Sequence, residues 1–172
     1  MATHAGDMHQ APAQPASLSP AKGLMVLGIV ILAVAAFIGI STAVGLTSVY
    51  GGFLFVFYFA GLCHAAPDKF APAVAGAFCG LGIAFLLAEL PAMMAHVGMV
   101  LALVLVLAAV YALIMGWAPL LVNHAAMLFL TVGTIPALQQ KTTLADMALS
   151  VALAAGLMGA LLLARRRHAA RA

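Results

Sequence analysis

The chain has 172 residues, of which 66% are apolar and 6% are charged, with seven Lys or Arg residues against four Asp or Glu residues. Soluble domains carry roughly 45–50% apolar and about 25% charged residues. Because so few charges cannot cover the surface of a water-soluble globule, the composition excludes a soluble domain and, with it, a soluble nucleic-acid-binding protein. At roughly 20 residues per membrane-spanning helix, the apolar residues suffice for five or six spans.

The first 23 residues differ in composition from the rest of the chain. They are rich in Ala, Pro, Gln and Ser and have no apolar periodicity. Such a segment cannot bury enough apolar surface to fold, and it lacks the early apolar core of a secretory signal. We therefore expect a disordered cytoplasmic tail over 1–23, a transmembrane domain over 24–164 and a basic cytoplasmic tail over 165–172.

Two long stretches contain no Asp, Glu, Lys or Arg, one from Leu24 to Pro67 and one from Leu90 to Gln140. Each is too long for one span and has room for two. Small, polar or proline residues mark the expected breaks inside them. The pattern predicts an all-α polytopic membrane protein with six transmembrane helices, at about 24–47, 50–66, 70–90, 96–116, 119–138 and 144–164.

The basic residues that flank the spans predict the orientation in the membrane. With the N-terminus inside, six spans leave only Lys141 on the outer side. All other basic residues then face the cytoplasm, namely Lys22, Lys69, Arg165, Arg166, Arg167 and Arg171. We therefore expect a multi-pass protein of the cell inner membrane with both termini in the cytoplasm.

The second and third spans can be aligned with the fifth and sixth. Residues 45–64 pair with 119–138 at an offset of 74, and residues 71–88 pair with 147–164 at an offset of 76. A real repeat would have three spans per unit, so the two copies would lie inverted in the membrane. Inverted repeats are common in transporters, with the pathway at the repeat interface. Chance similarity between Leu-rich and Ala-rich helices is the alternative explanation.

Small residues at helical spacing predict close approach of helix backbones. Gly76 and Gly80 form one such pair in the third predicted span. They indicate packing inside the bundle or a contact between two copies in a homo-oligomer.

Glu89 is a functional candidate because burying a charge in lipid is costly. It lies at the outer end of the third span, two residues before Pro91 and seven before His96. We expect Pro91 to break the helix, which would let Glu89 and His96 approach each other across a short outer loop. Glu89 is then either part of a proton-sensitive or cation-attracting mouth or an interfacial carboxylate in water.

The fifth predicted span supplies a second group of polar candidates. Asn123 and His124 lie in its first turns, and the repeat aligns His124 with Tyr50. At inverted positions, Tyr50 and His124 would line a pathway from opposite sides. The alternative is a histidine that packs at the membrane interface.

Two threonines follow on the same helix, before Pro136, and their hydroxyls are suited to bond carbonyls that the proline frees. The candidate substrate pathway therefore comprises Tyr50, Glu89, His96, Asn123, His124, Thr131 and Thr134.

The sequence contains no recognisable set of catalytic or metal-ligating residues. No nucleophile and base pair, paired carboxylates, phosphate-binding glycine loop or HExxH motif occurs. The predicted topology places His64 and His124 near the inner face and His96 near the outer face. A tetrahedral metal site needs its ligands to converge within ~2.0–2.3 Å of one ion. We therefore expect no enzymatic activity, no cofactor and no bound metal.

Two stretches resemble a known group of proteins. They are GLTSVYGGFLFVFYFAG, followed by a proline-containing turn and a Gly/Ala-rich helix, and LLVNHAAMLFLTVGTIPALQQKTTLADMALSVALAAGLMGALLL. Both resemble the small bacterial inner-membrane proteins grouped as domain of unknown function 1097, over about residues 24–164. The resemblance implies a six-helix inner-membrane protein and transfers no functional residues. The first span here lacks the tryptophans of that group.

Two functions are compatible with these patterns. An even span count, the repeat and polar groups near helix breaks favour a channel or permease for a small solute, whose identity the sequence does not specify. Scarcity of charge within the spans and short loops favour a non-transporting assembly or regulatory subunit that acts through helix–helix contacts. The expected partners are the lipid bilayer and a second copy of the chain, and we expect no nucleic acid.

Overall fold

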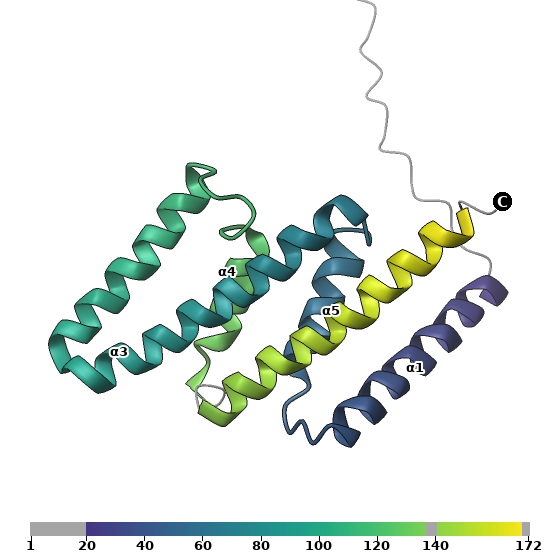
Figure 1. Cartoon of the computed structure of the whole chain (residues 1–172), viewed down its shortest axis with the longest axis horizontal. Helices are drawn as coiled ribbons and strands as arrows, with labels where there is room; N and C mark the ends of the chain where they lie inside the picture. The colour runs from purple at the N-terminus through teal and green to yellow at the C-terminus, as the bar shows by residue number, and fades with distance from the viewer. Residues whose placement is uncertain (1–19, 137–140, 170–172) are drawn as a thin grey trace, which may run out of the picture. The chain divides into compact units, whose positions relative to one another are not determined.

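The computed structural model describes residues 20–136 and 141–169, which form helices with no strand among them (Figure 1). The chain divides into two compact units, residues 1–36 and 37–172, and each is described by itself. Helix α1 spans Pro20–Ala43 and therefore begins inside the predicted tail. The rest of that tail lies outside the described residues.

The second unit holds the end of α1 and all the other helices. Helix α2, Tyr50–Val56, continues without a break into a π-helix, η1, Phe57–Leu62. Helix α3 spans Pro67–Ile114, α4 spans His124–Gly133 and α5 spans Lys141–Ala169. The expectation of an all-helical protein is confirmed for the described residues.

Two described helices are long and apolar enough to cross a membrane, α3 and the Thr143–His168 part of α5. Among the described residues, two helices and not six therefore meet the length and composition of a membrane span. Tyr50–Leu62 and His124–Gly133 are shorter apolar helices. At 1.5 Å per residue they are about 20 and 15 Å long, whereas the hydrocarbon layer is roughly 30 Å thick.

The short helices are bounded by backbone that a helix cannot adopt. Positive φ angles at His64 and Ala65 follow η1, so this helix ends before the predicted limit at residue 66. Positive φ angles at Gly116 and Ala118 precede α4. The predicted span over 119–138 therefore begins as a run of turns and becomes helical only at His124.

Helix α3 consists of two halves joined at a sharp bend, as Figure 1 shows. The bend lies at Ala95, which has φ 47° and ψ −123°, and the two halves correspond to the third and fourth predicted spans. The helix continues through Pro91, so the prediction that Pro91 breaks it is wrong. The backbone reverses where Gly98, which has no side chain, lies directly against the Leu90 carbonyl.

Each short helix packs against a long helix from the other half of the chain. Helix α2 packs mainly on α5, and α4 packs mainly on α3. A Cβ atom at Gly51 of α2 would lie 2.5 Å from the Met147 carbonyl oxygen of α5. One at Gly80 of α3 would overlap the Ala126 carbonyl oxygen of α4. The prediction that Gly80 packs inside the bundle is thereby confirmed.

Aromatic side chains form the centre of the core. Phe55, Phe59 and Phe129 are fully buried, and Phe70 stands edge-on to both Phe55 and Phe59, with ring centroids 6.3 and 5.3 Å away. Phe57 lies on the opposite side of the same helix and is exposed. Phe55, Phe57 and Phe59 occupy every second position of the sequence, and the helix places the first and last in the core and the middle one on the surface.

Candidate functional site

A cavity of about 500 Å³ lies where the end of η1, the start of α3 and the start of α4 meet. We call it the Asn123 cavity. Its polar lining residues are Tyr58, Cys63, Lys69, Asn123 and His124, and its apolar ones are Pro72, Ala73, Pro119 and Leu120. A concave site with a few converging polar groups is the usual form of a small-molecule binding site.

Asn123 holds this cavity together. Its Oδ1 accepts hydrogen bonds from the backbone N–H groups of Ala125 and Ala126, at 2.9 and 3.2 Å, and so caps the N-terminus of α4. The two hydrogens of its Nδ2 are shared among three backbone carbonyls at 2.8–3.2 Å, those of Pro72, Pro119 and Leu120. Asn123 therefore joins the preceding loop, α3 and α4, and its role is to position the cavity wall.

Gly76 of α3 makes room for the Asn123 side chain. A Cβ atom at Gly76 would lie 2.8 Å from the Asn123 Cγ and would overlap its Oδ1. The Gly76 and Gly80 pair thus serves two contacts with the same helix, one with the cap and one with the α4 backbone.

Replacing Asn123 with alanine is expected to destabilise the fold. The loss of an N-cap side chain costs about 0.5–2 kcal/mol, and the Pro72 carbonyl also loses a donor. We expect a lower midpoint of detergent-induced unfolding. Thr131→Ala is the control, because the Thr131 hydroxyl is exposed and bonds only within its own helix, to the Met127 carbonyl. Equal midpoints for the two variants would contradict the role given to Asn123.

The other polar side chains give the cavity an open, hydrogen-bonding wall. The Tyr58 phenol contacts the Cys63 side chain and the Ala125 backbone. The Lys69 Nζ lies 3.9 Å from the Asp68 Oδ2, and both side chains are mostly exposed, so this pair contributes little to stability. His124 is exposed at the first position of α4. The exposed polar groups at this wall are therefore Lys69 and His124, beside apolar lining residues.

A second hollow, of about 440 Å³, lies at the opposite ends of the two short helices. It is lined by Tyr50, Phe53, Leu54 and Phe57 from the α2–η1 helix and by Val132 and Ile135 from the end of α4. Since the start of α2 adjoins the end of α4, the two short helices run antiparallel. Tyr50 and His124 each begin a short helix, and the repeat alignment pairs them. In the structure, however, they border different cavities.

The remaining predicted pathway residues border neither cavity. The Thr131 and Thr134 hydroxyls donate to the Met127 and Thr131 carbonyls of α4, at 2.7 and 2.8 Å. Glu89 is half-buried in the first half of α3. His96 is exposed and directly follows the bend.

Asp146 is absent from the predicted pathway residues. Its side chain nevertheless contacts a residue 99 positions away in the sequence, Thr47. Its Oδ2 accepts a hydrogen bond from the Thr47 backbone N–H at 3.0 Å and another from the Thr47 hydroxyl. These bonds fix the loop before α2 to the start of α5. The rule that selects Glu89, an acidic residue within a predicted span, selects Asp146 as well.

No family model, curated protein or solved structure matches the chain. The resemblance to domain of unknown function 1097 therefore stays a prediction. Within residues 20–136 and 141–169, no three His, Cys, Asp or Glu side chains are grouped so that they could hold a metal ion.

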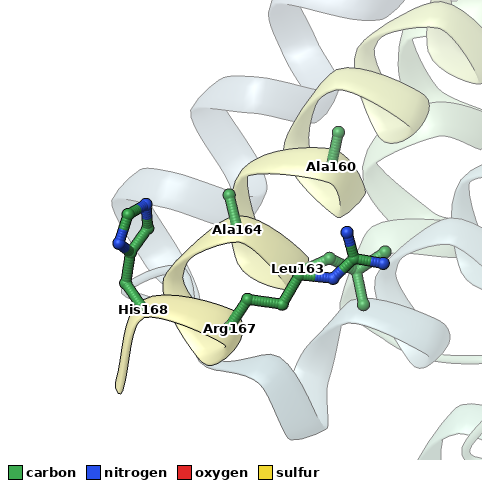
Figure 2. A pocket seen from close by; sticks show the side chains of 5 residues that line it. All are labelled: Ala160, Leu163, Ala164, Arg167 and His168. Carbon is green, nitrogen blue, oxygen red and sulfur yellow. The ribbon is translucent and has the colours of Figure 1, made fainter. Parts of the chain in front are cut away.

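A third hollow lies along the C-terminal part of α5, as Figure 2 shows. Its lining residues all come from this one helix: Ala160, Leu163, Ala164, Arg167 and His168. The predicted basic tail thus begins as the last turn of α5, where positive charge is favourable next to the negative end of the helix dipole. A groove along a single helix brings no groups together from different elements.

Proposed function

We propose that the protein is an inner-membrane channel or permease for a small solute, whose pathway follows the antiparallel pair α2–η1 and α4. One observation carries the proposal. Two short apolar helices begin at Tyr50 and His124, positions that the repeat aligns, and each packs on a long helix of the other half. In transporters built from inverted repeats, interrupted helices at corresponding positions of the two halves form the substrate site.

The exposed surface supports placement in a membrane. In the second half of α3, small buried residues, among them Ala102 and Ala109, form one packed stripe. Large apolar side chains are exposed around the rest of the helix, among them Val97, Val100, Leu103, Leu107 and Ile114. Soluble monomers rarely expose apolar patches larger than a few hundred Å². Lipid is the environment that such a helix favours.

We propose six crossings, made by α1, the α2–η1 helix, the two halves of α3, α4 with its flanking turns, and α5. Non-helical backbone is tolerated at membrane depth where protein surrounds it or where it lines a water-filled cavity. The short helices meet this condition if they lie between the long ones. With both termini in the cytoplasm, the Asn123 cavity opens inward and the hollow beside Tyr50 opens outward.

The test is solute flux through the full chain in liposomes, followed by stopped-flow light scattering. The panel comprises small neutral solutes, weak acids and monovalent ions, with protein-free vesicles as the baseline. We expect one solute to permeate faster with the protein present. We also expect His124→Ala to change the rate of that solute, because His124 borders the proposed pathway.

The two cysteines supply a matched pair for locating the pathway. Cys63 lines the Asn123 cavity, whereas Cys79 lies half-buried on α3 away from it. A thiol-reactive reagent is expected to slow flux through the Cys79→Ser variant, which keeps Cys63, and to leave the Cys63→Ser variant unaffected. Inhibition of the Cys63→Ser variant alone would place the pathway elsewhere.

The second candidate function is a non-transporting assembly or regulatory subunit. The exposed apolar side chains of the second half of α3 favour it, because this half offers a long surface to a partner helix. Absence of flux across the whole panel, from protein shown to be folded, would support this function and contradict the first.

A further inference from the structure

Polar residues of three neighbouring segments adjoin where the loop before α2 meets the start of α5. We call Ser41, Thr47, Ser48 and Asp146 the Asp146 cluster. Thr47 binds the Asp146 carboxylate through both its backbone N–H and its hydroxyl. The Leu46 N–H donates to the Ser41 carbonyl at 2.9 Å, which folds the loop back on the last turn of α1. The four residues therefore come from three segments that these hydrogen bonds hold together.

Two hydroxyls of the cluster are buried without a hydrogen-bond partner among the described residues. Ser41 is 0% exposed and Ser48 is 4% exposed, and neither Oγ atom has a partner. A third buried serine nearby is satisfied, because the Ser150 Oγ accepts from the Gly52 N–H at 3.0 Å and donates to the Met147 carbonyl at 2.9 Å. Buried polar groups in native proteins usually have a partner, and an orphan points to a bound water or ion.

The charges around the cluster favour a cation. Among the side chains that the structure describes, Asp146 has hydrogen-bond donors and no cationic partner. Helix α1 ends at Ala43, beside the loop, and a helix C-terminus carries partial negative charge. Carboxylate, hydroxyl and carbonyl oxygens are the ligands that hard cations prefer.

We propose that a small monovalent cation binds at the Asp146 cluster, held by the Asp146 carboxylate and the hydroxyls of Ser41 and Ser48. The bound cation supplies both orphaned hydroxyls with a partner and neutralises the carboxylate. It also joins α1, the loop and α5, so binding stabilises the fold. The inference concerns binding alone and does not depend on solute transport.

The test is thermal unfolding of the detergent-purified full chain in NaCl, KCl or choline chloride at one ionic strength. We expect the melting temperature to rise with Na⁺ and to saturate. At a free cation concentration about a hundred times its Kd, the ratio of folded to unfolded protein rises about a hundred-fold. Choline, a bulky quaternary ammonium ion, serves as the ionic-strength control. Equal melting curves in NaCl and choline chloride would overturn the proposal.

Serine variants separate a ligand role from a structural one. Ser41→Ala and Ser48→Ala each remove an orphaned hydroxyl, so neither is expected to lower stability in choline chloride. Both are expected to lose the response to Na⁺, as is Asp146→Asn. Thr42→Ala is the matched control, because the Thr42 hydroxyl is exposed and bonds to the Ile38 and Gly39 carbonyls of its own helix. A full Na⁺ response in both serine variants would also overturn the proposal.

Discussion

Replacing Gly98 with alanine is expected to force apart the two halves of α3 and to destabilise the fold strongly. A Cβ atom at this position would overlap the Leu90 carbonyl oxygen and lie 2.9 Å from the Pro91 nitrogen. Both are backbone atoms, so no side-chain rotation relieves the overlap and the bend itself must open. Overpacking of a core costs about 1–3 kcal/mol and occasionally more, and we expect the upper part of that range.

The control for Gly98 is Gly82, which lies in the first half of the same helix. No atom lies within 4 Å of a Cβ atom built at Gly82. Alanine is a better helix former than glycine by about 1 kcal/mol, so Gly82→Ala is expected to leave the midpoint of detergent-induced unfolding unchanged or to raise it. If Gly98→Ala unfolds at the same midpoint as Gly82→Ala, the tight contact at the bend does not hold.

Composition predicts the helical class, because a chain with 66% apolar and 6% charged residues is typical of a membrane protein. Helices satisfy the backbone hydrogen bonds of such a chain in lipid. The positions of several helices are predictable for the same reason. The break expected around residues 47–52 falls where α2 begins, at Tyr50. The repeat alignment, which pairs Tyr50 with His124, also pairs the starts of the two short helices. Patterns of apolar and small residues therefore locate these helices well.

Helix lengths and turns are less predictable, because residues that usually favour helices form the breaks. Ala95, Ala118 and Ala65 all adopt positive φ angles, which sequence reasoning assigns to glycine or asparagine. Pro91, which predicts a break, lies inside the helix. Tertiary contacts decide these positions, as the close approach of Gly98 to Leu90 illustrates.

In the candidate site, too, some features are predictable from the sequence and others appear only in the fold. Asn123 and His124, which the sequence predicts at the start of the fifth span, border a cavity, and their role in a pathway stays a prediction. Tyr50 does not join them, because the two short helices run antiparallel and their first residues lie at opposite ends. No pattern in the sequence predicts the burial of Ser41 and Ser48, because serine is mostly exposed in proteins. Only the fold reveals that their hydroxyls lack partners.

Replacing Gly80 with alanine is expected to separate α3 from α4, with the second large loss of stability. A Cβ atom at Gly80 would overlap the Ala126 carbonyl oxygen and lie 2.9 Å from the Leu130 nitrogen, both in the α4 backbone. Because α4 carries Asn123 and His124, a shift of this helix also deforms the Asn123 cavity. We expect a lower midpoint of detergent-induced unfolding and, if the protein transports a solute, a lower flux from the fraction that still folds.

The repeat itself provides the control for Gly80. The offset of 76 aligns Gly80 with Gly156 of α5, and no atom lies within 4 Å of a Cβ atom built there. Gly156→Ala is therefore expected to be tolerated, although the predicted repeat aligns the two glycines. Equal losses from the two variants would mean that a contact common to both halves, and not the packing of α3 on α4, sets the stability. A loss from Gly80→Ala alone would assign the lost stability to the packing of α3 on α4.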